Sequence, residues 1–292
     1  MRTLIFLIRA VIYSNLFVSI CITLLTHQTY ILLQLPDQDK YYLLTFVFCS
    51  TYFTYNFQRI LRLKLRELLG KQIGIRLSWV VRNRKVLLFS AILALFISFM
   101  MIFFMSKNFI LFSIPLSALS TLYVVPFFRF KGKKVALRNL PYLKVFIIAV
   151  VWAFVIVGLP YFNHHKGLLL NSNAGWLFLS QFLFIMAITL PFDVRDLNYD
   201  LATQIKTFPS KIGIRGTILF SEILLLGFMA VKYYQFHLGH LQRIQFISLV
   251  VATIISGTII AFTARKRSEL FYSGLVEGTM MIMYVSILLL EY

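Results

Sequence analysis

Long uncharged runs constrain this chain more than any other feature of its sequence. Residues 10–36, 86–106 and 145–165 contain no Asp, Glu, Lys or Arg, and only 13% of the chain is charged. A soluble domain carries roughly 25% charged residues, whereas a membrane-spanning helix needs about 20 predominantly apolar ones. Spans of a membrane β-barrel are short and alternate in polarity. The runs therefore predict an all-α polytopic membrane protein.

The positions of the basic residues support a specific topology. We expect about nine spans, at approximately 10–33, 41–60, 86–106, 109–128, 141–161, 174–192, 217–235, 244–263 and 270–290. If the connecting segments alternate between sides, about 24 of the 29 Lys and Arg residues fall on one side. This bias places the amino terminus in the cytoplasm, and a bacterial plasma (inner) membrane is the expected location.

The net charge of +19 does not indicate a nucleic-acid partner, because the basic residues flank apolar spans. The lipid bilayer is the partner that this pattern predicts. No long linker or low-complexity tract interrupts the sequence. We therefore expect a single transmembrane domain over 1–292, with the longer polar loops, and any chemistry, on the cytoplasmic side.

Three of the ten acidic residues follow the sixth predicted span at spacings i, i+3 and i+7: Asp193, Asp196 and Asp200. On a helix they share one face, where like charges repel unless a cation or a basic partner is present. Mg²⁺ is commonly held by one or two carboxylates together with substrate phosphates, and the nearby Lys206 and Lys211 could bind further phosphate oxygens. The alternative is a hydrated loop whose aspartates pair with Arg195 and its neighbours.

Segment 193–213 resembles the second aspartate-rich motif of the UbiA superfamily of intramembrane prenyltransferases. In that superfamily the aspartate cluster is followed by a basic residue, Thr-Leu-Pro and a later glycine, and the sequence Lys206-Thr207-Phe208-Pro209 with Gly213 matches this tail. Leu122-Tyr123-Val124-Val125-Pro126, followed by Arg129 and Lys131, is similar to the family's Tyr-Ser-Pro and Lys-Arg stretch. With about nine spans, the resemblance covers essentially the whole chain.

The resemblance implies nine helices around a central cavity that opens sideways to lipid. It implies Mg²⁺ as the cofactor, with Asp193, Asp196 and Asp200 as catalytic residues and metal ligands. The implied reaction is transfer of an isoprenyl group from a prenyl diphosphate to an aromatic or other apolar acceptor. Departure of the diphosphate leaves an allylic carbocation, which aromatic π faces can stabilise.

The family's first aspartate-rich motif is degenerate in this sequence. Asn56 matches its asparagine, but the three aspartate positions hold Phe57, Ile60 and Lys64, so the first metal cluster is lost. Three arginines occupy this region with the same i, i+3, i+7 spacing as the aspartates: Arg59, Arg62 and Arg66.

Two explanations of this basic stripe lead to different functions. In the first, the arginines bind the diphosphate directly in place of one Mg²⁺, because a guanidinium matches phosphate oxygens bidentately. The predicted diphosphate-binding residues are then Asn56, Arg59, Arg62, Lys206 and Lys211. In the second, the basic and acidic stripes pair, and the protein is a catalytically inactive lipid-binding or scaffolding member. A third interpretation is that the arginines only mark the cytoplasmic border of the span.

Two further groups of polar residues are weaker candidates. Glu222 and Glu277 lie within apolar spans, where a carboxylate is costly and often marks function. Glu222 could instead reach the interface, and Glu277 could be protonated or paired. Arg138 and Lys144, near the start of the fifth span, could contact an acidic group or only follow the positive-inside rule.

Overall fold

The computed structural model describes residues 2–68, 75–130, 133–165, 169, 173–202 and 205–289, and these are mostly helical. The α-helices, in chain order, are α1 (Arg2–Tyr13), α2 (Leu16–Leu33), α3 (Lys40–Leu68), α4 (Ile75–Arg82), α5 (Arg84–Ile102), α6 (Lys107–Leu122), α7 (Leu143–Ala153), α8 (Leu159–His164), α9 (Asn173–Ala202), α10 (Phe208–His237), α11 (Arg243–Ala261) and α12 (Glu277–Leu288). Strands β1 (Phe128–Phe130) and β2 (Lys133–Val135) pair antiparallel.

The predicted membrane-spanning character is confirmed. Within the described residues, seven helical segments are long and apolar enough to cross a membrane: Leu16–Leu33, Arg84–Ile102, Leu143–His164, Asn173–Ala202, Phe208–His237, Arg243–Ala264 and Phe271–Leu288. The other two predicted spans, 41–60 and 109–128, fall on α3 and on the shorter apolar helix α6. Helix α6 ends at Leu122, earlier than predicted, because the chain then turns into strand β1.

The first predicted span, 10–33, is divided into α1 and α2 at Asn15. The backbone there is left-handed, with φ 66° and ψ 11°, a conformation that asparagine adopts more readily than most residues. The break directs the buried Asn15 side chain toward α3, where its Nδ2 donates to Asn56 Oδ1 at 3.0 Å. A simple hydropathy argument misses this break, because the residues on both sides of it are apolar.

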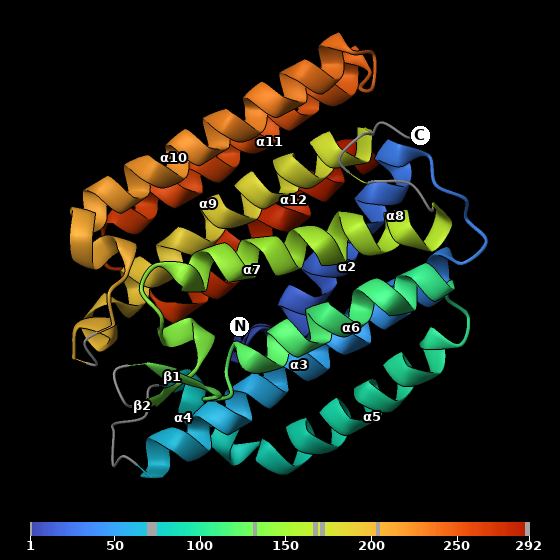
Figure 1. Cartoon of the computed structure of the whole chain (residues 1–292). Coiled ribbons are helices and arrows are strands. Elements are labelled where there is room, and N and C mark those ends of the chain that lie inside the picture. Colours follow the sequence, from blue (N-terminus) through green and yellow to red (C-terminus); the bar gives the residue numbers. More distant parts are fainter. Residues whose placement is uncertain are drawn as a thin grey trace.

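The helices run roughly along one direction and form a bundle. Helices α10 and α11 lie along one side of the bundle and α5 along the other, as Figure 1 shows. Helix α4 and the β1–β2 hairpin lie at one end, whereas α8 and the carboxyl terminus lie at the opposite end. The cytoplasmic loops of the predicted topology thus collect at the end that carries α4.

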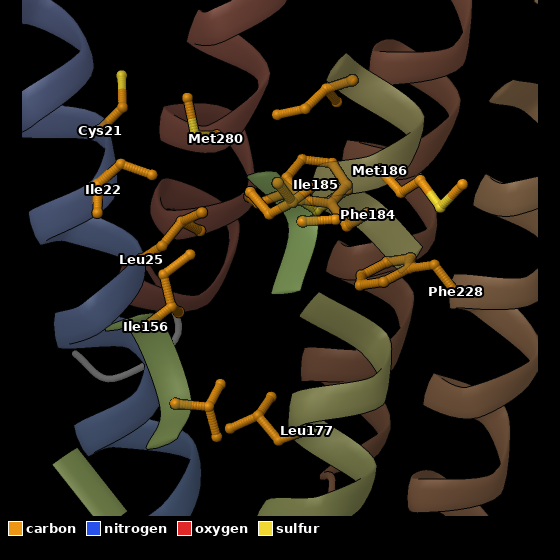
Figure 2. Packing of buried hydrophobic residues seen from close by; sticks show 14 of the residues in the cluster. Cys21, Ile22, Leu25, Ile156, Leu177, Phe184, Ile185, Met186, Phe228 and Met280 are labelled. Carbon is orange, nitrogen blue, oxygen red and sulfur yellow. The ribbon is translucent and has the colours of Figure 1, made fainter. Parts of the chain in front are cut away.

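The central apolar core is built from helices distant in sequence. Figure 2 shows Ile22 and Leu25 of α2, Phe184 and Ile185 of α9, and Met280 of α12 converging in the middle of the bundle. Buried apolar side chains fill the space between these helices. A dense core of this kind keeps the inner ends of the helices at fixed separations.

The structure at the start of α10 explains why Thr, Pro and Gly follow the aspartates in the motif. The Thr207 backbone N–H donates to Ser210 Oγ at 2.9 Å in a capping box, and Pro209 lies in the first turn. Gly213 has φ 74° and ψ 172° and kinks the helix. A positive φ of this kind favours glycine. The Thr-x-Pro and Gly positions therefore shape the entry into α10.

Two π-helical segments occur among the helices of the bundle. One, Phe154–Gly158, joins α7 to α8, and the other, Phe271–Val276, leads directly into α12. Such segments are rare and occur often at functional sites, because they displace side chains from the regular helical face. The second segment contains Ser273, which accepts a hydrogen bond from Arg76, and directly precedes Glu277, which lines a cavity.

Candidate functional site

A cavity with a volume of about 560 Å³ lies between helices α2, α3, α5, α6, α7, α9 and α12. Its charged lining comprises five basic and two acidic side chains: Arg59, Arg76, Arg138, Lys144, Arg195, Asp196 and Glu277. The remainder of the lining is mainly apolar and aromatic, with several Ser and Thr residues. The described lining is therefore cationic in one part and apolar in the rest.

The chain directions place the charged and apolar parts at different depths. Lys144 begins α7 and Arg195 lies near the end of α9, so both belong to the predicted cytoplasmic side. Phe46, near the start of α3, and Ile102, at the end of α5, belong to the other side. Two aromatic rings between these levels, Tyr55 and Trp152, stack with centroids 5.8 Å apart. A polar headgroup and an apolar tail would fit this arrangement.

Asp193, the first predicted aspartate, forms an ion pair inside the protein. Its Oδ1 lies 2.6 Å from Lys144 Nζ, and its side chain is only 2% exposed. The lysine side chain is also nearly buried, at 12% exposed. A buried charge requires such a partner. Lys144 therefore supplies the positive group that the aspartate spacing predicted.

Asp196 also has a basic partner, the neighbouring residue on its own helix. Arg195 donates from Nε and Nη2 to the two carboxylate oxygens, at 2.8 and 3.1 Å. The same guanidinium lies 5.0 Å from the ring centroid of Phe192 and 5.8 Å from that of Tyr272. Both members of this pair line the cavity. The pair combines a bidentate ionic contact with aromatic support.

The three predicted metal ligands do not form a metal site in the described structure. Asp200 is buried near the end of α9, one turn beyond Asp196. Among the residues that the structure describes, no three His, Cys, Asp or Glu side chains are placed to hold a metal ion. Asp193 and Asp196 are engaged by Lys144 and Arg195, and the first motif contributes no carboxylate. These residues do not fit a two-cluster magnesium site.

Arg76, another basic residue of the cavity lining, is held by three hydrogen bonds. It donates from Nη1 to Ser273 Oγ at 2.5 Å, and from Nη2 to Asn15 Oδ1 at 3.1 Å and Ile12 O at 3.2 Å. Burial lowers the pKa of this guanidinium, and the nearby Glu277 opposes the effect. Arginine nevertheless remains protonated in proteins. Arg76 therefore presents a fixed positive charge to the cavity.

The predicted diphosphate-binding residues separate into three groups. Arg59 lines the cavity and donates to Tyr13 O at 3.1 Å, whereas Asn56 is buried beside it and hydrogen-bonds within the protein. Lys206 and Lys211 are exposed, and neither is among the residues that line the cavity. The side chain of Arg62 lies outside the described residues, as does that of Arg66 in the same stripe.

Sequence reasoning did not select Arg76 as a candidate. Helix α4 is short and follows residues 69–74, which lie outside the described residues, and no motif surrounds it. In the sequence, nothing distinguishes Arg76 from the other basic residues of this loop. Only the structure shows that α4 packs against the α1–α2 junction, where Arg76 donates to Ile12 O. Lys144 and Arg138 were weaker candidates, and both line the cavity.

Comparison with known proteins agrees with this architecture. A sequence model of the UbiA prenyltransferase family matches residues 77–270, which is more than half of the chain. This chain belongs to the UbiA family. No curated protein matches the sequence closely enough to count as a relative.

Solved structures share the fold over almost their entire length. A UbiA homologue from Archaeoglobus fulgidus bound to GPP and Mg²⁺ superposes with a TM-score of 0.64, at 14% identity, over 96% of this chain and 99% of its own. A UbiA homologue from Aeropyrum pernix gives 0.62, at 14% identity, over 97% and 96%. A digeranylgeranylglyceryl phosphate synthase gives 0.57, at 15% identity, over 96% and 98%.

These findings establish the family and the helical membrane fold. A structure of the Archaeoglobus protein contains a prenyl diphosphate and Mg²⁺. At such low identity, the likeness establishes the fold and leaves the reaction of this chain to be argued from its own residues. The seven apolar helices and the family together identify an integral membrane protein.

Proposed function

We propose that this UbiA-family protein transfers an isoprenyl group from a prenyl diphosphate to an aromatic or other apolar acceptor. The reaction would take place at the cytoplasmic side of a bacterial plasma membrane. The observation that carries the proposal is the cavity, because its lining joins a cluster of basic side chains to a long apolar and aromatic wall. A lipid tail with an anionic headgroup has matching chemistry along its length.

The basic side chains would bind the departing diphosphate. When the allylic C–O bond breaks, its electron pair leaves with the diphosphate oxygen, and Arg76, Arg195 and Lys144 are placed to stabilise that developing charge. The allylic carbon becomes cationic. The stacked aromatic side chains Tyr55 and Trp152 line the cavity beyond the charged end, and their π systems can stabilise this cation.

The acceptor would complete the reaction by donating an electron pair to the allylic carbon and releasing a proton. Asp196 and Glu277 are the carboxylates in the described lining of the cavity, and either can receive that proton. Glu277 follows the π-helical segment 271–276, which positions it at the start of α12. A structure of the Archaeoglobus homologue contains GPP and Mg²⁺, whereas the residues described for this chain do not fit the two-cluster magnesium site that the resemblance implies.

A second candidate function is a catalytically inactive lipid-binding or scaffolding protein. The pairing of Asp193 with Lys144 and of Asp196 with Arg195 favours it, because the resemblance to the family implies those aspartates as metal ligands. Such a protein would keep the cavity and bind a prenyl lipid without releasing diphosphate. The two candidates therefore differ in turnover rather than in binding.

The assay that tests the proposal uses the full chain in liposomes with prenyl diphosphates labelled in the prenyl group. We expect an apolar labelled product and stoichiometric diphosphate when a suitable phenolic or quinonoid acceptor is supplied. Binding without diphosphate release would support the inactive candidate. If no prenyl diphosphate binds in any buffer, both candidates are wrong.

A larger side chain at the apolar end of the cavity should reduce the maximum length of prenyl chain that the cavity can bind. Ser113 lines the cavity from the outer half of α6, and its hydroxyl bonds only its own helix, to Ile110 O, in the described structure. We expect Ser113→Phe to weaken binding of long prenyl diphosphates about tenfold or more, while short ones bind normally. Thr258→Phe, at an exposed position on α11, is the control. Equal weakening for all chain lengths would contradict this placement of the tail.

A further inference from the structure

The lining of the cavity carries a net positive charge, whereas a site that holds a metal ion through carboxylates is negative before the ion binds. Five basic side chains line the cavity against two acidic ones. Asp193 contributes a negative charge nearby, but Lys144 compensates it at 2.6 Å. A multivalent cation would enter a region that is already positive, whereas a multivalent anion would be attracted to it.

The basic side chains come from separate elements and are held by the fold. Arg59 belongs to α3, Arg76 to α4, Lys144 to α7 and Arg195 to α9. Arg76 makes three hydrogen bonds to α1, Asn15 and the π-helical segment 271–276. Its Nε is buried and has no hydrogen-bond partner in the described structure. Unsatisfied buried donors of this kind are uncommon in native proteins, and a contact with a ligand is one explanation of them.

A hydrogen-bonded chain connects the retained asparagine of the first motif to Arg76. Asn56 Nδ2 donates to Ser14 O and Tyr52 O, which fixes its amide, and Asn56 Oδ1 accepts from Asn15 Nδ2. Asn15 Oδ1 in turn accepts from Arg76 Nη2 at 3.1 Å. The residue that matches the family's metal motif thus helps to position a guanidinium.

We infer that this chain binds the diphosphate group of its substrate directly through Arg59, Arg76, Lys144 and Arg195, without a divalent metal ion. The inference rests on the proposed function and deepens it. Guanidinium groups donate paired hydrogen bonds that match phosphate oxygens. This binding mode explains why the aspartates do not form a metal site. The positive charge that neutralises the diphosphate comes from protein side chains and not from a metal ion.

Asp196 has a different role in this arrangement from that of a metal ligand. Without ligand, its carboxylate occupies the Nε and Nη2 groups of Arg195. A diphosphate that binds Arg195 must compete with this carboxylate for the same donors. Removing the carboxylate charge should therefore leave diphosphate affinity unchanged or increase it, whereas removing a metal ligand would reduce it.

Metal removal tests the inference on the full-length protein in nanodiscs. The probe is geranyl S-thiolodiphosphate, an analogue that reacts too slowly for turnover to disturb the measurement. We expect its dissociation constant in EDTA to lie within about threefold of that in MgCl₂. Arg195→Gln should weaken binding about tenfold or more in both buffers, whereas Arg215→Gln, at an exposed position on α10, should not.

The Asp196→Asn variant separates the two kinds of site by the direction of its effect. We expect its affinity for the analogue in EDTA to equal or exceed that of the unmodified protein. A thermal melt confirms that the variant is folded, and Asp196→Ser repeats the comparison if Asp196→Asn melts early. Reduced affinity in both folded variants would overturn the inference.

The remaining outcomes distinguish the inference from the proposed function. Binding and turnover that both require Mg²⁺ overturn the inference and leave the prenyl transfer proposal intact. Absence of binding in both buffers contradicts both. We also expect inorganic diphosphate to displace the analogue in EDTA. Displacement by phosphatidic acid vesicles but not by inorganic diphosphate would overturn the assignment to a diphosphate.

Discussion

Replacing Arg76 with glutamine is expected to weaken prenyl diphosphate binding about 10- to 100-fold. The substitution removes a guanidinium that three hydrogen bonds hold at the cavity wall. Glutamine can retain one of these bonds but carries no charge for the diphosphate. The measurement is the dissociation constant of an unreactive prenyl diphosphate analogue, determined by calorimetry on the protein in nanodiscs.

The matched control for Arg76→Gln lies on the same helix. Arg82 is the last residue of α4 and is exposed, and it is not among the residues lining the cavity. We expect Arg82→Gln to bind the analogue as the unmodified protein does. If both substitutions have the same effect, the loss reflects the charge of the whole loop and not a specific contact. Arg76→Lys should recover part of the affinity, since it restores the charge without the paired donors.

The sequence predicted the fold in detail because spans and loops differ strongly in polarity. The apolar segments place most helices correctly, and the positive-inside bias indicates the cytoplasmic end. The break at Asn15 was missed because it rests on one left-handed residue within an apolar run. The early end of α6 was missed for a related reason, since Tyr123 to Pro126 remain apolar after the helix stops.

The candidate site could be predicted only in part. The spacing of Asp193, Asp196 and Asp200 predicted a positive partner, and the structure supplies Lys144 and Arg195. The sequence already offered Arg195 as a partner, because it is adjacent to Asp196 on the same helix. It did not assign Lys144 to Asp193, because that contact depends on how α7 packs against α9. Arg76 was missed since its role depends on a contact between α4 and the α1–α2 junction, distant in sequence.

Replacing Lys144 with methionine should cause the largest loss of stability among the substitutions considered. It leaves Asp193, whose side chain is 2% exposed, without the ammonium at 2.6 Å. Breaking a buried ion pair by removing one partner costs about 3–5 kcal/mol, because an uncompensated charge remains. The measurement is the free energy of unfolding in mixed micelles, determined by titration with SDS and followed by tryptophan fluorescence.

A second substitution decides whether the unpaired charge causes that loss. In Lys144→Met combined with Asp193→Leu, no charge remains buried, and we expect most of the lost stability to return. The ion pair between Lys40 and Asp37 provides a surface comparison, because its N–O distance is 2.8 Å but the aspartate is 74% exposed. Lys40→Met should cost under about 1 kcal/mol. If the double variant is as unstable as Lys144→Met alone, packing of the lysine stem rather than its charge stabilises the junction of α7 and α9.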